Sequence, residues 1–201
     1  MPARRAPLSR ERVVAAAMEI ADGDGIAAVT MRRLAEVLGV HPTSIYNHLA
    51  TKEAILDAVA DAVMADAELP TEFADWREWV HELAAGMRRT ARRHPRAFLV
   101  LTQRTAHGPA GAEITESALE AFRRGGFSPA QAALAVGAVS LALLGVALNE
   151  CPPTAPLDQP ELVDLDPIRF PRIREAWDLD VDPDAVWKLV VSSLVAGLEQ
   201  R

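Results

Sequence analysis

Residues 30–49 read TMRRLAEVLGVHPTSIYNHL, and this stretch decides the fold that we expect for the chain. Thr30 can cap a helix, because its hydroxyl can accept a hydrogen bond from an unpaired amide of the first turn. Gly39 can end that helix, since a residue without Cβ enters the left-handed conformation without a clash. The apolar residues between them recur at helical spacing and form one face: Met31, Leu34, Ala35 and Leu38.

A second short helix follows the turn. Pro42 suits its first turn, where the missing N–H would have no partner in any case. Ile45 and Leu49 can anchor this helix to a core, so the two helices and their glycine turn predict a helix-turn-helix. Its outer face carries hydrogen-bonding groups and no carboxylate, which suits a major groove lined by base edges and flanked by phosphates. The residues of this face are Thr43, Ser44, Tyr46, Asn47 and His48.

The charge of the chain is unevenly distributed. The net charge is −7, but residues 1–52 hold seven basic and five acidic residues, which leaves −9 for the remainder. A mildly basic end on an acidic body favours a protein that contacts DNA at one end only. With 50% hydrophobic and only 5% aromatic residues, the composition favours an all-α globular protein.

Several classes of protein are disfavoured. Cys151 is the only cysteine, so no intrachain disulfide can form and a reducing, cytoplasmic location is expected. No signal peptide is recognised at the N-terminus. Residues 132–148 are uncharged but short for a membrane span, so a helix buried in a core or an interface is the preferred interpretation. No metal pair, phosphate loop or nucleophile elbow points to an enzyme.

Two domains are predicted, with a boundary near Leu56. Residues 1–56 form the DNA-binding domain and residues 57–201 a ligand-binding and dimerisation domain. The expected helices begin or end at proline, glycine and capping residues. They cover residues 9–23, 30–38, 42–49, 51–69, 76–94 and 95–105, then a helix ending at 124, then 130–149, 171–177 and 183–198.

The first fifty or so residues resemble the DNA-binding domain of TetR-family transcriptional repressors. The resemblance lies in LAEVLGVHPTSIYNHLATKEAIL, with Tyr46, His48 and Lys52 in the expected order. The rest of the chain is similar to the tetracycline-repressor type of ligand-binding domain. That likeness rests on the segments GGFS, LLGVALNE and FPRI, followed by DPDAVW and LVAGLE.

The resemblance implies a homodimer that places one recognition helix in each half-site of a palindromic operator. It also implies a four-helix interface from residues 130–149 and the last helix of each subunit, and release by a small-molecule effector. The positions of two metal-binding residues of the tetracycline repressor fall at Val100 and at Asn149, beside Glu150. Valine cannot bind a metal and asparagine is a poor substitute for a carboxylate, so we expect no metal, no cofactor and an effector other than tetracycline.

The candidate DNA-contacting residues each have a plainer alternative. Arg32 and Arg33 can bind phosphates or form a solvated face, and Tyr46 can bind a phosphate or fill a structural gap. Asn47 is the best candidate for reading a base, because its amide can bond N6 and N7 of adenine. The full set also includes surface polar candidates: Thr30, Arg32, Arg33, Thr43, Ser44, Tyr46, Asn47, His48 and Lys52.

Ligand-contacting candidates are taken from the aromatic, methionine and polar residues of the body. Ordinary core packing is the preferred interpretation of the aromatic residues, and a surface or satisfied histidine is preferred for His81 and His107. The candidates are Trp76, Trp79, Met87, Phe98, His107, Asn149 and Trp177. A regulator that answers to a protein partner in place of a small ligand is the alternative function.

Overall fold

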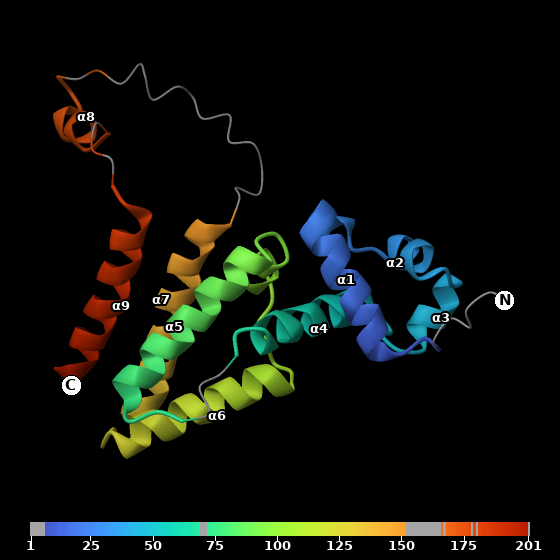
Figure 1. The fold of residues 1–201 in the computed structure, drawn as a ribbon, viewed down its shortest axis with the longest axis horizontal. Helices are drawn as coiled ribbons and strands as arrows, with labels where there is room; N and C mark the ends of the chain where they lie inside the picture. The colour runs from blue at the N-terminus through green and yellow to red at the C-terminus, as the bar shows by residue number, and fades with distance from the viewer. Residues whose placement is uncertain are drawn as a thin grey trace.

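The computed structural model describes residues 7–68, 72–151, 166, 168–177, 179 and 181–200, and these contain helices and no strand, which confirms the all-α fold (Figure 1). The α-helices are α1 (Arg10–Asp24), α2 (Met31–Leu38), α3 (Pro42–Tyr46), α4 (Lys52–Ala65), α5 (Trp76–Arg93), α6 (Pro109–Arg124), α7 (Pro129–Ala147), α8 (Pro171–Trp177) and α9 (Pro183–Glu199). Three short 3-10 helices are η1 (Ile26–Ala28), η2 (Phe98–Thr102) and η3 (Leu148–Glu150).

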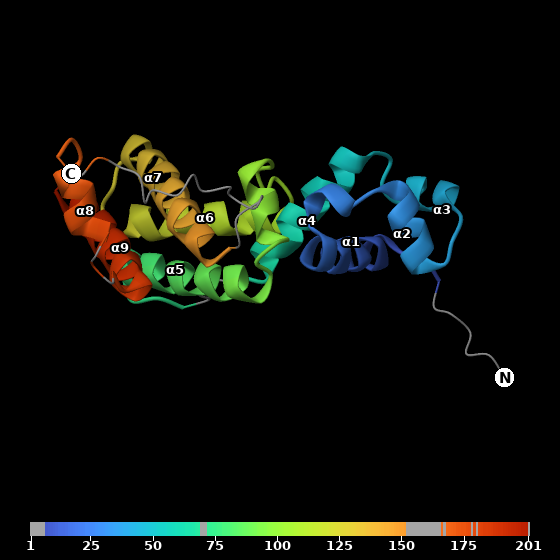
Figure 2. The same ribbon diagram turned by 90° about the horizontal axis from the view of Figure 1, so that it is seen from above.

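The first three helices form a small head at one end of an elongated molecule, and α5 to α9 form the body at the other end (Figure 2). Helix α1 packs against both α2 and α4, and α2 packs against α3. The apolar face of α1 is fully buried and includes Val13, Ala17 and Ile20. It packs with Leu34 of α2 and Ile45 of α3. Burial of these roughly five apolar side chains stabilises the head.

Helix α4 connects the head to the body. Its N-terminal half packs on α1, while contacts with α6 and η2 lie on the body side. The helix continues without a break through Leu56, which is buried, and the domain boundary placed there stays a prediction. Helix α4 therefore contacts elements of both the head and the body.

The body is a bundle in which α7 packs against α5, α6 and α9. One end of the bundle holds a cluster of four rings, in which Trp76 lies 5.6 Å from Phe122 and 5.5 Å from Phe127 between ring centroids. Trp79 is also buried there, 6.4 Å from Phe122, and its indole nitrogen donates to the Ser117 hydroxyl at 2.9 Å. Gly125 is close to this cluster, because a Cβ at that position would lie 2.4 Å from the Trp76 ring.

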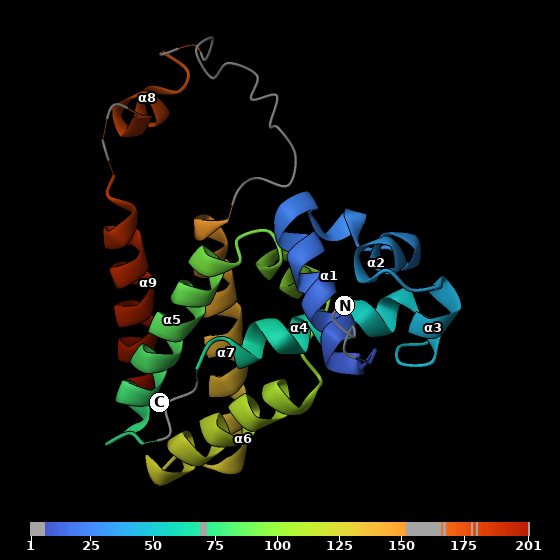
Figure 3. The same ribbon diagram turned by 45° about the vertical axis from the view of Figure 1, so that its right-hand side comes forward.

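Helices α5 and α9 run side by side and are joined by an ion pair at each end (Figure 3). Arg77, at the start of α5, donates to Glu199, at the end of α9, at 2.5 Å. Arg88, in the second half of α5, donates to Asp184, in the first turn of α9. The pairing shows that the two helices are antiparallel and that α9 is fixed to α5 near both of its ends.

Three of the expected helices are shorter than the sequence predicted. The helix expected at residues 95–105 was wrong: η2 is a 3-10 helix, because the amides of Val100 and Gln103 bond three residues back and that of Ala97 donates to Asp22. Helix α3 ends at Tyr46 rather than at residue 49, and α4 ends at Ala65 rather than at residue 69. In both cases the last amides bond three residues back, which tightens the final turn.

Candidate DNA interface and ligand pocket

The turn between α2 and α3 has the geometry that the sequence predicted. The Thr30 hydroxyl accepts from the amide of Arg33 at 3.2 Å. Gly39 adopts the left-handed conformation with a φ of 64°, and the next amide, that of Val40, donates to the Ala35 carbonyl at 3.1 Å. This arrangement is a helix C-terminus closed by glycine, and it redirects the chain toward α3.

His41 caps α3, a role that the sequence analysis missed. Its Nδ1 accepts from the amide of Thr43 at 3.4 Å and lies 2.9 Å from the Thr43 hydroxyl. The residue before Pro42 is the N-cap because proline occupies the first helical position, so the signal was present in the sequence. His41 is exposed at the end of α3 that faces outward with Thr43, so it joins the candidate contacts.

The side chains of α3 divide cleanly between the core and the outer surface. Ile45 and Leu49 are buried and hold the helix on the head. Tyr46 is 50% exposed, which favours a surface contact over a structural plug. Of the remaining predicted residues, Thr30, Thr43 and Asn47 are exposed, whereas Ser44 and His48 are half-buried. The arrangement presents hydroxyl, amide and imidazole groups together.

The arginines at the start of α2 are accessible. Arg32 lies 3.7 Å from Glu36 and its side chain is 90% exposed, while Arg33 lies 3.3 Å from Asp24. Exposed ion pairs of this kind contribute at most about 1 kcal/mol, so phosphate oxygens can replace these carboxylates. Lys52 is half-buried in the first turn of α4, which begins where the Thr51 hydroxyl accepts from the amide of Ala54 at 3.0 Å.

A polar junction joins the head to the body. Nδ1 of His94, at the end of α5, lies 2.5 Å from Oδ2 of Asp22 in the last turn of α1. The second oxygen of Asp22 accepts from the amide of Ala97 at 3.1 Å, and Arg96 donates to the carbonyl of Gly23. Asp66, just after α4, accepts from Arg93 at 2.7 Å. The end of α1 is therefore bonded to the segment that leads into η2.

The body contains a pocket of about 270 Å³ between α4, α5, α6 and α7. This volume is just below the roughly 300 to 1,000 Å³ of usual ligand pockets, so the pocket suits only a ligand at the small end of that range. Most of its lining is apolar, and the polar groups are an arginine and three hydroxyls. The lining consists of Met64, Leu83, Met87, Leu101, Arg104, Thr105, Ala106, Gly111, Ile114, Thr115, Ser140, Leu141 and Leu144.

The predicted ligand-contacting residues lie in several different places. Met87 lines the pocket, whereas Trp76, Trp79 and Phe98 are buried in the core, which was the preferred interpretation. His107 lies on a separate groove of about 670 Å³ between α1, α4 and the start of α6. Asn149 borders a hollow of about 330 Å³ beside the start of α9. The side chain of Trp177 lies outside the described residues.

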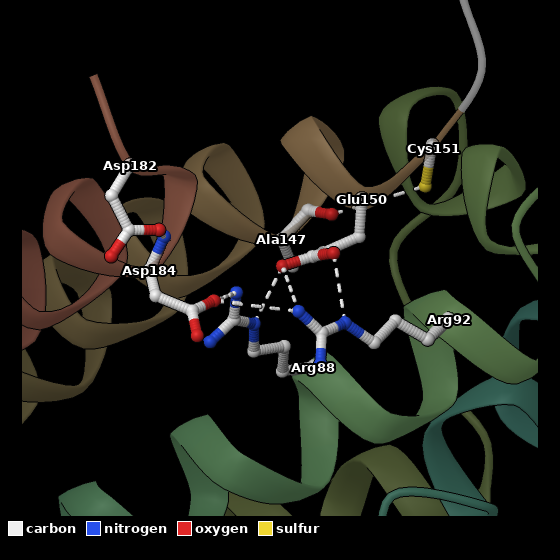
Figure 4. A network of polar contacts seen from close by, with 7 residues as sticks. All are labelled: Arg88, Arg92, Ala147, Glu150, Cys151, Asp182 and Asp184. Atoms are coloured by element: carbon white, nitrogen blue, oxygen red, sulfur yellow. Dashed lines mark hydrogen bonds and ion pairs between the residues drawn. The ribbon is translucent and has the colours of Figure 1, made fainter. Parts of the chain in front are cut away.

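Glu150 belongs to an ionic network where α5, η3 and α9 meet (Figure 4). It accepts from Arg88 at 2.5 Å and from Arg92 at 2.9 Å, and the Arg88 guanidinium stacks 4.8 Å from the centre of the Trp187 ring. Burial raises the pKa of Glu150, but the bonds from Arg92 and Arg88 outweigh it and hold the pKa below its ordinary value. Two arginines neutralise this carboxylate, and Val100 is buried in η2, so neither position offers a divalent cation an anionic ligand.

Helix α7 with η3, Pro129–Glu150, is apolar and long enough to cross a membrane by length and composition alone. Its packing against α5, α6 and α9 is that of a helix within a bundle. Large apolar side chains remain on its outer face, where Leu134 is 75% exposed and Leu141 is 77% exposed. Exposed apolar side chains of this kind are typical of a surface that binds a protein or a membrane.

Both parts of the chain match models of known protein families. A family model described as "Bacterial regulatory proteins, tetR family" matches residues 13–59, and one described as "Tetracyclin repressor-like, C-terminal domain" matches residues 69–201. A transcriptional regulator of helix-turn-helix type from Saccharopolyspora erythraea is 35% identical over 139 residues, spanning 69% of this chain but 59% of that regulator. The class D tetracycline repressor protein of Escherichia coli is 31% identical over 200 residues, spanning 96% and 90% of the two chains.

Solved structures agree with these matches. The chain is similar to ActR of Streptomyces coelicolor in complex with actinorhodin, with a TM-score of 0.81, 30% identity and coverage of 97% and 98% of the two chains. It is also similar to a tetracycline-repressor variant from Acinetobacter baumannii in complex with minocycline, with a TM-score of 0.73, 28% identity and coverage of 96% and 98%.

Proposed function

The chain belongs to the TetR family of bacterial transcriptional regulators, and we propose that it is a repressor that binds a palindromic operator as a homodimer and releases it when a small molecule binds. The observation that carries this proposal is the outer face of α3. It presents Thr43, Tyr46 and Asn47 on a helix of the head, beside the exposed arginines of α2. A recognition helix with such a face reads base edges while flanking groups bind phosphates.

The residues of the head divide into two roles. Asn47 is exposed just after α3 and is the proposed base-reading residue, because its amide can bond two atoms of adenine at once. Tyr46, His48 and Lys52 are proposed to bind phosphates together with Arg32 and Arg33. Thr30, Thr43 and Ser44 complete the proposed interface. Such phosphate contacts position the head without selecting a sequence.

Homodimerisation is proposed through the outer faces of α7 and α9. Leu134 and Leu141 on α7, with Leu189 on α9, are each at least 66% exposed. A Cβ added at any of three glycines of these helices, Gly137, Gly145 and Gly197, would meet nothing within 4 Å, so their small size is not required inside one subunit. Glycine in a helix interior lowers stability by roughly 1 kcal/mol relative to alanine. These glycines would still be useful in a dimer, because they allow the helices of a second copy to approach closely.

The body pocket is the proposed effector site. It is mostly apolar and touches α4, the helix that joins the body to the head, through Met64. The relatives ActR and the tetracycline-repressor variant were solved with actinorhodin and minocycline respectively, which supports a small-molecule effector for this chain as well. As a regulator of bacterial genes, the protein would act in the cytoplasm, where the DNA lies.

A footprint on the DNA that flanks the gene of this protein tests the proposal. We expect protection of a palindrome whose half-sites lie one helical turn or more apart, because each head contacts one half-site. A footprint titration with the purified protein at moderate salt gives the measurement. Absence of any protected site would contradict the proposed function.

A further inference from the structure

Residues 103–108 connect η2 to α6, and we call this segment the pocket loop. It borders two separate spaces. On one side, Arg104, Thr105 and Ala106 line the body pocket. On the other side, His107 and Gly108 border the groove against α4. Five consecutive residues of this loop therefore border both the space where an effector would bind and the groove beside the helix that leads to the head.

Two carboxylates of α4, one turn apart, receive the pocket loop. Nη1 of Arg104 lies 3.5 Å from Oδ1 of Asp57, at the outer limit of a hydrogen bond. Asp61 accepts from the amide of Gly111 at 3.1 Å, and a Cβ on Gly108 would lie 2.3 Å from the carboxyl carbon of Asp61. The contact at Asp61 is made by backbone and is tightly packed, whereas the contact at Asp57 depends on a long, adjustable side chain.

Arg104 is the donor in the pocket lining that favours a ligand with an acceptor group. The hydroxyl of Thr115 donates to the carbonyl of Gly111 at 2.8 Å, and that of Ser140 donates to Val136 at 2.8 Å, so both protons are already used. Arg104 is the one charged side chain among the described residues that line the pocket, and no carboxylate lies among them. An anionic group would find a cation in the lining, and the carboxylate nearest to that cation, Asp57, lies outside the lining on α4.

We propose that the effector is a small, mainly apolar organic acid whose carboxylate binds the Arg104 guanidinium and thereby takes Arg104 away from Asp57. The inference rests on the proposed function, since it specifies the effector of that same pocket and the contact through which binding reaches the head. The existing pair is weak, because Asp57 is 55% exposed and water screens the interaction. A carboxylate in a mostly apolar pocket can accept two parallel N–H bonds from the guanidinium, which makes it the stronger partner.

Competition for Arg104 couples the pocket to α4. When the acid binds, the Asp57 contact is lost, while the backbone contact at Asp61 remains as a pivot. Helix α4 then loses its side-chain contact with the pocket loop, keeps the hydrogen bond from α6 to Asp61, and can change its angle relative to the body. By reciprocity, whatever strengthens the Arg104–Asp57 pair must weaken binding of the acid by the same factor.

The first experiment compares acids with their neutral amides. Benzoate, 2-naphthoate and 2-anthroate are tested against benzamide, 2-naphthamide and 2-anthramide on the full-length protein by thermal shift and calorimetry. At least one acid is expected to bind roughly tenfold or more tightly than its amide, because charge-assisted bonds are about twice as strong as neutral ones. The preference should disappear in Arg104→Gln and persist in the control Arg89→Gln, an exposed arginine paired only loosely with Glu68 at 3.9 Å. Equal binding of every acid and its amide, including no binding of either, would overturn the proposal.

The second experiment uses Asp57→Asn, which removes the competing partner. We expect this variant to bind the preferred acid several-fold more tightly than the unmodified protein. It should also bind operator DNA more weakly without the acid and show a smaller further loss of operator binding when the acid is added, because the contact that the acid breaks is already missing. A residue with only a structural role would not increase affinity. Glu113→Gln, an exposed carboxylate on α6, serves as the matched control and should leave these quantities unchanged. Unchanged or weaker acid binding by Asp57→Asn would contradict the competition.

Failure of this inference and failure of the proposed function give different results. Operator binding by the ligand-free protein tests the function, and it does not involve the acids. If the footprint is present but no acid is preferred over its amide, only the inference is wrong. If no operator is protected, the function is wrong, while the acid–amide comparison still reports the chemistry of the pocket.

Discussion

Nδ1 of His94 lies 2.5 Å from Oδ2 of Asp22, and this contact joins α5 of the body to α1 of the head. The residues are 72 positions apart in the sequence, so the contact exists only in the folded protein. Together with the bond from the Ala97 amide to Asp22, it fixes the end of α1 beside η2. The head is therefore attached to the body both by the continuous helix α4 and by this second polar junction.

Removal of the Asp22 carboxylate is expected to destabilise the protein. In Asp22→Ala the amide of Ala97 and the ring of His94 each lose a part-buried partner, and an unsatisfied polar group costs about 1–3 kcal/mol. The free energy of unfolding from urea titrations measures the effect. Asp24→Ala provides the control, because Asp24 makes an exposed pair with Arg33 that contributes at most about 1 kcal/mol. Equal losses in the two variants would contradict the role of the junction.

Stability should depend on pH through Glu150. Bonds from Arg92 and Arg88 hold the pKa of Glu150 in the folded protein below its ordinary value of 4.5, despite burial. A carboxylate whose pKa is lower in the folded than in the unfolded protein stabilises the fold at pH values above its unfolded pKa. That contribution is lost as the pH falls through the pKa of the folded state. Glu150→Gln should therefore lower the free energy of unfolding at pH 7 by about 1–3 kcal/mol. The difference from the unmodified protein should shrink below pH 4.5 in urea titrations, and a difference that does not change with pH would contradict this assignment.

Cys151 is expected to react slowly with thiol reagents. Burial, with a smaller effect of the neighbouring Glu150 charge, raises the pKa of the Cys151 thiol to about 11. The thiolate is the reactive form, so little of it is present at pH 8. Ellman's reagent should modify the folded protein much more slowly than the urea-unfolded protein. Equal rates in the two states would show that the thiol is not shielded in the folded protein.

The proposed dimer surface can be tested with Leu134→Glu. Leu134 is 75% exposed in the subunit, so the substitution should not lower the stability of one chain, but it would bury a charge between two copies. Sedimentation velocity should show a shift from dimer to monomer. Leu179→Glu is the matched control, because Leu179 is 66% exposed and lies outside α7 and α9. A dimer that persists in Leu134→Glu would place the interface elsewhere.

Asn47 and Lys52 are expected to act differently on operator binding. Asn47→Ala should relax the preference at one base pair of each half-site by about 1–3 kcal/mol, because a bidentate contact to a base is lost. Lys52→Ala should weaken all sequences equally and reduce the dependence on salt by about one counterion. Binding titrations against operator variants at several salt concentrations separate the two effects. Identical behaviour would refute the division of roles.

The sequence predicted local features well because local chemistry determines them. Thr30, Gly39 and Pro42 set the turn through capping, a left-handed residue and a proline at the first helical position, and each acts within a few residues. Large aromatic residues are usually buried, and Trp76 and Trp79 lie in the core as that rule predicts.

The pocket could not be predicted in the same way. Its lining comes from four helices and the pocket loop, and most of its members are common apolar residues that carry no signal in the sequence. Arg104 acquires a candidate role only because the fold places its side chain between the pocket and Asp57, 47 positions away. The replacement of an expected helix by η2 had a similar origin, since Asp22 of a distant helix captures the amide of Ala97.

The attachment of α9 at both ends has a consequence for how such proteins can diverge. Arg77 and Arg88 contact α9 through Glu199 and Asp184, and α9 also packs against α7, so contacts within the body hold α9 in place. A change in the length of the connection between α7 and α9 need not displace α9, because these contacts are made by the helices themselves. Related proteins could therefore differ in the length of this connection while the proposed dimer surface on α7 and α9 is kept.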